Sequence, residues 1–518
     1  MSIEPRAHHF GLALALCGAV GTMACTPPAT GATLELVDDD GKADNYYSTV
    51  ASEYEALGSL PVPMTAEQYA NPTTRADLAR RRITALGLYL TAYVTDKEAE
   101  IFTNTSYGGF HAMVRNRSID DLRISGSPAT EVRVAFTIDM AGPKDLLTHI
   151  PATLGTTATA SKTTFDVQMP KDASIDPTDV PWRTIRAFDP KTYSGELETV
   201  RFQASVLPES KDAYPEFSSF FSDGVFDITL FQGHDYNAQR SDLRESEEQF
   251  DWLVAHGFTA PVASYAELVA ESGPFTRDIT AGGKKVKVEV RIFHSDMFKT
   301  ARAAQKALAI SELVTRDVFF YNGHAGPYYG FYLDADKAAQ VEPAELQSAP
   351  FTSKKQIFIA NGCQTYSQYA DNLYANPKKT EANLDVITTV NFSYGDGTFE
   401  FLDALLRTDD KGRHDPQTMH SLVDAYNSDY LNGEEVFVGA MGIDGNPVLH
   451  PYAATQKIGA SCSADSDCGD ATGNRCILKS GTQHVCAAVA LARRGCPTGT
   501  RYKGVASAGT IVAHVCAK

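Results

Sequence analysis

The spacing of hydrophobic positions changes twice along the chain. Between residues 51 and 215 a helical pattern from Arg75 to Val94 gives way to strict alternation of apolar and polar residues over 131–140. Such alternation predicts a half-buried antiparallel strand, and it recurs at 165–169 and 200–206, with Pro, Asp and Gly between the runs. We therefore expect a β-rich, sandwich-like N-terminal domain over residues 51–215. Catalytic residue types do not gather there, so we assign it no chemistry.

From residue 216 to 455, short continuous apolar runs alternate with helical patterns. The helix after the first run is expected to begin at Asp242, with Glu245 completing a capping box. Continuous apolar strands separated by helices predict a parallel sheet with helices on both faces. The expected fold class is α/β, with a β-rich domain before this sheet and a small disulfide-rich module after it. The five runs are 225–231, 286–293, 317–321, 356–360 and 384–392.

The first fifty residues have the pattern of an export signal and a linker. Residues 1–24 contain an apolar run from Phe10 to Ala24, which is too short to span a bilayer and has the length of a signal-peptide core. The sequence Thr22-Met23-Ala24-Cys25 resembles a bacterial lipobox, because a small residue directly precedes Cys25. This predicts lipidation of Cys25 and membrane anchoring, with ordinary secretion as the alternative. Residues 25–50 are Pro-rich and then acidic, as in a tether.

Cysteine positions separate a C-terminal module, residues 456–518, from the rest. Six of the nine Cys residues lie there, and their density in a short exported segment predicts three disulfides, with fifteen connectivities open. Cys363 then has no obvious partner, so it is either a reactive thiol or a small buried hydrophobe. The six are Cys462, Cys468, Cys476, Cys486, Cys496 and Cys516.

Composition narrows the range of partners. The 518 residues are 43% hydrophobic and 21% charged, which is typical of globular domains. A net charge of -18, without a local basic patch in the sequence, argues against nucleic acid and anionic membrane surfaces as partners. After residue 25 the sequence has no apolar run long enough to span a bilayer.

Polar residues follow the apolar runs: His234, His294, His324, Cys363 and Asp396. In α/β sheets, catalytic groups gather beyond the carboxyl ends of the strands. If the third and fourth strands are neighbours, about 4.8 Å apart, His324 and Cys363 reach thiol–imidazole distance. An imidazole that takes the thiol proton makes Cys a nucleophile, and backbone amides of Cys363 and of Ala325 or Gly326 are candidate donors to the oxyanion.

Around these residues the chain resembles the caspase/gingipain/clostripain group of cysteine peptidases. DVFFYNGHAG at 317–326 and QIFIANGCQT at 356–365 carry the resemblance, which covers roughly residues 220–450. It implies an endopeptidase with a caspase-like fold, His324 as base, Cys363 as nucleophile, a protein or peptide substrate, and neither metal nor cofactor. The chain departs from the group's pattern where Ala325 separates His324 from Gly326. Asp396 would select Arg or Lys in a specificity pocket, or serve as an ordinary turn residue.

Two alternatives remain open at this point. In the first, a metal-dependent hydrolase uses the polar residues at the strand ends as ligands while Cys363 only packs. In the second, a non-catalytic surface-binding protein keeps the peptidase-like fold. The candidate ligands are His234, Asp235, His294, Asp296 and His324.

Overall fold

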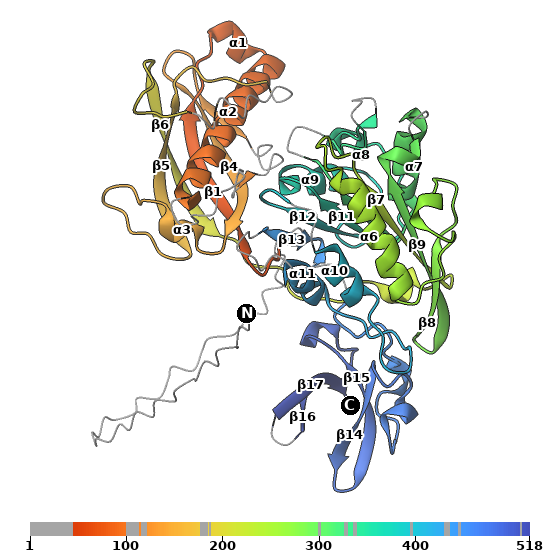
Figure 1. Ribbon diagram of the computed structural model, residues 1–518. Helices are drawn as coiled ribbons and strands as arrows, with labels where there is room; N and C mark the ends of the chain where they lie inside the picture. Colours follow the sequence, from red (N-terminus) through yellow and green to blue (C-terminus); the bar gives the residue numbers. More distant parts are fainter. Residues whose placement is uncertain are drawn as a thin grey trace, which may run out of the picture. The chain divides into compact units, whose positions relative to one another are not determined.

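A computed structural model describes the chain in twelve segments, and within them it contains three β-sheets (Figure 1). Residues 1–44 lie outside the described part, and with them the signal-peptide and Cys25 predictions, as do Gly326 and Asp396. Among the helices of the described residues, none combines the length and apolar content needed to cross a bilayer. The segments are 45–99, 113–114, 122–176, 185, 188–298, 302–325, 330–334, 339–393, 397–428, 436–443, 447–507 and 510–518.

The described part of the chain begins at residue 45, within the predicted tether. Tyr46 is buried, and Tyr47 exchanges backbone hydrogen bonds with Ala440 at 2.9 and 2.8 Å. The prediction of a solvated linker up to residue 50 is therefore wrong for its last residues. The Pro-rich and acidic composition that motivated it ends at Asp44, whereas Tyr46 and Tyr47 are aromatic residues that favour burial.

The first sheet has six antiparallel strands in the order β2-β4-β1-β6-β5, with β3 beside β4. Its apolar face packs against α2 through a shared core that includes Leu86, Phe136 and Phe202. The fold here is one sheet covered by a helix and not the expected two-sheet sandwich, because alternation reveals a buried face but not what buries it. The elements are β1 (Ala51–Pro61), α1 (Ala66–Ala70), α2 (Pro72–Ala99), β2 (Met113–Val114), β3 (Arg123–Gly126), β4 (Val132–Pro143), α3 (Leu146–His149), β5 (Lys162–Pro170) and β6 (Leu197–Val206).

The second sheet has seven strands in the order β13-β12-β11-β10-β7-β9-β8. The five strands predicted from apolar runs, β7, β9, β10, β11 and β12, are adjacent and parallel, which confirms the parallel core. The edge strands β8 and β13 are antiparallel to their neighbours. The strands are β7 (Val225–Gln232), β8 (Phe275–Ala281), β9 (Lys284–His294), β10 (Val318–Asn322), β11 (Gln356–Asn361), β12 (Leu384–Thr389) and β13 (Val438–Met441).

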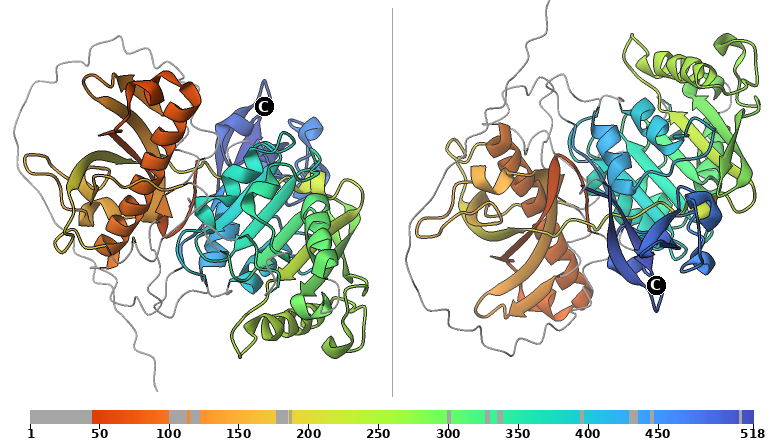
Figure 2. Two further views of the ribbon diagram at one scale, coloured as in Figure 1. Left: turned by 90° about the horizontal axis from the view of Figure 1, so that it is seen from above. Right: turned by 90° about the horizontal axis from the view of Figure 1, so that it is seen from below.

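Helices cover both faces of this sheet (Figure 2). Successive side chains of a strand point to opposite faces, and the strand residues are apolar throughout, so both faces must be buried. Phe320 belongs to the core under α6, α10 and α11, whereas its neighbour Phe319 belongs to the core under α7, α8 and α9. The helices are α5 (Phe217–Phe220), α6 (Ser241–Ala255), α7 (Arg302–Thr315), α8 (Pro343–Leu346), α9 (Tyr369–Tyr374), α10 (Thr398–Leu405) and α11 (Met419–Ser428).

The start of α6 differs from the predicted capping box. Arg240 is the N-cap in a left-handed conformation, with φ 46°, and its side chain does not cap the helix. The Asp242 carboxylate binds the Arg240 guanidinium at 2.8 and 2.9 Å, and Glu245 accepts a hydrogen bond from Asn322 at 2.7 Å. Both carboxylates thus bind side chains from outside the first helical turn. These partners compete with the backbone amides of the helix, and the capping-box spacing does not reveal which partner is bound.

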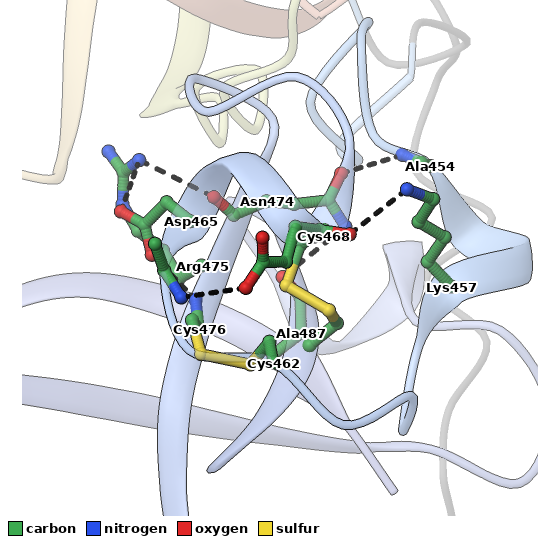
Figure 3. The surroundings of a disulfide bond; sticks show 12 residues. Ala454, Lys457, Cys462, Asp465, Cys468, Asn474, Arg475, Cys476 and Ala487 are labelled. Atoms are coloured by element: carbon green, nitrogen blue, oxygen red, sulfur yellow. Dashed lines mark hydrogen bonds and ion pairs between the residues drawn. A yellow bond between two sulfur atoms is a disulfide. The ribbon is translucent and has the colours of Figure 1, made fainter.

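The third sheet, in the order β14-β15-β17-β16, belongs to the cysteine-rich module. Its cysteines form the three predicted disulfides, two of which are Cys462–Cys476 and Cys468–Cys486. The third is Cys496–Cys516. Figure 3 shows the surroundings of Cys462–Cys476, with Cys468 nearby. Disulfides are typical of non-cytoplasmic proteins, and here they stabilise a module whose apolar core is small. The strands are β14 (Asn474–Ser480), β15 (Gln483–Val489), β16 (Arg501–Ser507) and β17 (Thr510–Ala517).

Candidate active site

A cavity of about 480 Å³ lies beyond the carboxyl ends of the parallel strands. Strand β7 lies between β9 and β10. From β7 the chain continues to β8 and β9 on one side, and from β10 it continues to β11 and β12 on the other side, so the strand order reverses between β7 and β10. Such switch points are where α/β sheets leave a crevice for ligands. The loops after β7, β10, β11 and β12 all contribute to the lining, which includes Asp235, Tyr236, His324, Cys363, Phe392 and Ser393.

The tips of β10 and β11 bring His324 and Cys363 into this cavity. Asn322 and Asn361 are partners in the parallel register, and the amide of Gly323 donates to the Asn361 carbonyl at 3.0 Å. A Cβ placed on Gly362 would lie only 2.6 Å from the Ala325 Cβ, so the two loops are in contact. The predicted base and nucleophile therefore follow neighbouring strands and line one cavity.

The His324 ring is held by three kinds of contact. Its Nε2 lies 3.2 Å from Asp235 Oδ1, and the Tyr236 ring stacks on it at a centroid distance of 4.1 Å and an interplanar angle of 13°. The backbone carbonyl of His324 accepts hydrogen bonds from the Tyr321 hydroxyl at 2.6 Å and the Tyr332 amide at 3.1 Å, which fixes the main chain that carries the ring. Nδ1 makes no hydrogen bond to any residue that the structure describes, so it is available to take a proton.

Asp235 is the residue that orients the imidazole. Its carboxylate also accepts the amide hydrogens of Asn237 at 2.9 Å and Ser241 at 3.0 Å, the latter at the first residue of α6. Burial raises the pKa of the Asp235 carboxyl, but these amides and the His324 ring together lower it below its ordinary value. The group is therefore an anion at neutral pH, suited to hold an imidazolium.

The sequence predicts Asp235 only as a ligand in the metal alternative. Its position after the apolar run 225–231 indicates that it lies at the same edge of the sheet as His324. The strand order, which places β7 beside β10, was needed to recognise it as the partner of His324.

Cys363 is the free cysteine of the described residues, and it is half-buried. Burial raises the pKa of its thiol, against the opposing effect of the backbone amides of Ser393 and of Cys363 itself. The thiol is consequently protonated at neutral pH and needs a base to become a nucleophile. The next residue, Gln364, has a φ of +59°, which costs backbone energy in a residue other than Gly and turns the chain sharply after Cys363.

The amides proposed as oxyanion donors lie on the two contacting loops. Within the described residues, neither the Ala325 nor the Cys363 amide donates to a backbone carbonyl. Gly326, the third candidate, is outside the described part. The Cys363 amide interacts with its own thiol sulfur, and both amides lie on contacting loops, an arrangement that can stabilise a developing negative oxygen.

The remaining strand-end residues do not join this cavity. His234 Nδ1 lies 3.0 Å from the Ser295 hydroxyl, and Asp296 binds Arg240 at 2.8 Å. Across the described segments, the metal-donor atoms of these residues and of Asp235, His294 and His324 form no group of three within 4.8 Å. The metal alternative therefore lacks a converging ligand set there, and Asp396 lies outside the described part.

The comparisons with known proteins do not assign the chain to a family. No family model, no curated protein and no solved structure matches it.

Proposed function

We propose that this chain is an exported cysteine endopeptidase that hydrolyses peptide bonds through His324 and Cys363. The observation that carries the proposal is the meeting of the β10 and β11 tips, which places both side chains in one cavity at the switch point of the sheet. The Asp235 contact to His324 adds the orienting group that thiol–imidazole chemistry uses. The resemblance to the caspase/gingipain/clostripain group supports the same reaction.

The first half of the reaction is acylation of the thiol. His324 Nδ1 takes the proton from Cys363 Sγ, and the thiolate attacks the peptide carbonyl carbon. The carbonyl oxygen becomes negative and accepts hydrogen bonds from the Cys363 and Ala325 amides. As the C–N bond breaks, the imidazolium gives its proton to the leaving amine, which leaves a thioester on Cys363.

In the second half, His324 takes a proton from a water molecule that attacks the thioester. The C–S bond breaks, the carboxylic acid leaves, and the proton on His324 returns to the Cys363 thiolate. The Asp235 anion stabilises the imidazolium in both halves and fixes which ring nitrogen faces the reaction. The substrate is a polypeptide entering an open cavity of about 480 Å³.

The proposed location of the enzyme is the cell envelope or the extracellular medium. The three disulfides favour an oxidising compartment. Cleavage of residues 1–24 and lipid on Cys25 would then hold the enzyme at a membrane.

Hydrolysis of a mixed peptide library tests the proposal. Iodoacetamide should abolish turnover and a chelator should leave it intact. Cys363→Ala and His324→Ala should each remove essentially all turnover without unfolding the chain. The nucleophile and the base act as one unit, so removing either residue costs about as much activity as removing both. His234→Ala is the matched control, since His234 also follows a strand of this sheet but does not line the cavity.

Two results would contradict the proposal. Inhibition by the chelator alone would indicate a metal-dependent hydrolase. Turnover that survives Cys363→Ala would show that the thiol is not the nucleophile.

A further inference from the structure

The C-terminal module differs in charge from the rest of the chain. Residues 456–518 contain eight Lys and Arg residues against three Asp and no Glu, although the whole chain has 46 basic and 64 acidic residues. Such asymmetry points to a partner of opposite charge.

The module's fold opens a groove between two hairpins. Hairpin β14–β15 and hairpin β16–β17 are joined by only two residue pairs, Ala488 with Cys516 and Val489 with Val515. Further along β15, the backbone of residues 484–486 bonds instead to residues 460–462. The hairpins therefore diverge, and a cavity of about 490 Å³ lies between them.

The groove has an apolar floor and a cationic rim. Ile477 and Val505 line the floor, pack against the buried Val515 and keep part of their surface accessible, and Leu478 beside them is 59% exposed. On the rim, Lys479 and Lys503 are exposed, and neither pairs with a carboxylate of the described residues. Arg475 also lines the groove, but it already binds Asp465 at 3.6 Å (Figure 3).

We propose that this groove binds an extended acidic peptide segment of a partner protein. In an extended strand, side chains alternate between two directions, so a peptide of alternating acidic and apolar residues can place apolar groups on the floor and carboxylates on the rim. Strands β14 and β16 are the edges of the sheet, and their free backbone groups can pair with an added strand.

Other anionic partners fit less well. Single-stranded nucleic acids stack their bases on aromatic rings, and among the described residues that line the groove the only ring is that of His484. A flat anionic membrane would meet the exposed Lys479 and Lys503 but not the partly buried Ile477 and Val505 between the hairpins.

The test uses the full chain carrying Cys363→Ala, which prevents cleavage of the probe. The probe is a fluorescein-labelled octapeptide of alternating Asp and Val, followed by fluorescence polarisation. We expect saturable binding that weakens at least tenfold in the double variant Lys479→Glu/Lys503→Glu. We also expect a similar loss when Ser replaces Val in the peptide.

The matched control is Arg493→Glu/Arg494→Glu, which changes the charge of the module equally but lies outside the groove lining. The affinity of this control variant for the peptide should stay within twofold of that of the parent protein. Absence of peptide binding, equal weakening in both double variants, or binding to phosphatidylglycerol vesicles in place of the peptide would overturn the proposal.

Discussion

Gly362→Ala should disable the site while leaving the fold in place. The added Cβ would lie 2.6 Å from the Ala325 Cβ, 2.7 Å from the Gly323 carbonyl oxygen and 3.3 Å from the Ala325 amide nitrogen. Carbon atoms in contact normally lie about 3.5–4.0 Å apart, so the two loops must separate by about 1 Å. The neighbours are a Cβ and backbone atoms, which have no flexible side chain to swing aside.

The expected cost in stability is that of overpacking, about 1–3 kcal/mol. A displacement of about 1 Å between a base and a nucleophile costs on the order of 100-fold in rate, so kcat/KM should fall far more than stability does. Peptide hydrolysis and urea denaturation measure the two effects. Gly273→Ala is the control, because its nearest atom beyond its chain neighbours is 3.9 Å away. Activity of Gly362→Ala within threefold of the parent would refute the contact between the loops.

Three further predictions address the charges and the disulfides. Asp235→Asn should lower kcat by about 10- to 150-fold with little change in KM, because a hydrogen bond to a charged group contributes about 1.5–3 kcal/mol; an equal rise in KM would argue for a role in binding. Burial lowers the pKa of His414 to about 4, so its contribution to stability is present above about pH 6.5 and lost as pH falls toward 4; the urea midpoint should drop over that range, and less so in His414→Gln. Replacing Cys496 and Cys516 with Ser should cost the C-terminal module about 3 kcal/mol, since their loop spans 20 residues, and hydrogen exchange across β16 and β17 should rise accordingly.

The parallel core could be predicted from sequence because its strands are buried on both faces. Continuous apolar runs such as 317–321 and 356–360 mark such strands with little ambiguity. The residues that follow them, His324 and Cys363, therefore lie at the edge of the sheet that the sequence predicts. The spacing between runs also left room for covering helices, which the structure confirms.

The features that sequence missed depend on strand order or on competition between partners. Asp235 meets His324 only because β7 lies beside β10, which local pattern does not specify. Asp242 and Glu245 have the spacing of a capping box, yet Arg240 and Asn322 bind them instead. Likewise, the alternation in β4 predicted a buried face, but only the packing of α2 shows what covers it.

The most direct test of the central claim is the rate at which iodoacetamide alkylates Cys363, followed by peptide mapping and mass spectrometry. Burial raises the pKa of this thiol, so the proposed mechanism makes formation of the reactive thiolate depend on the His324 imidazole in the same cavity. We predict alkylation at least tenfold slower in His324→Ala and unchanged in His234→Ala. An equal rate in His324→Ala would contradict proton sharing between His324 and Cys363.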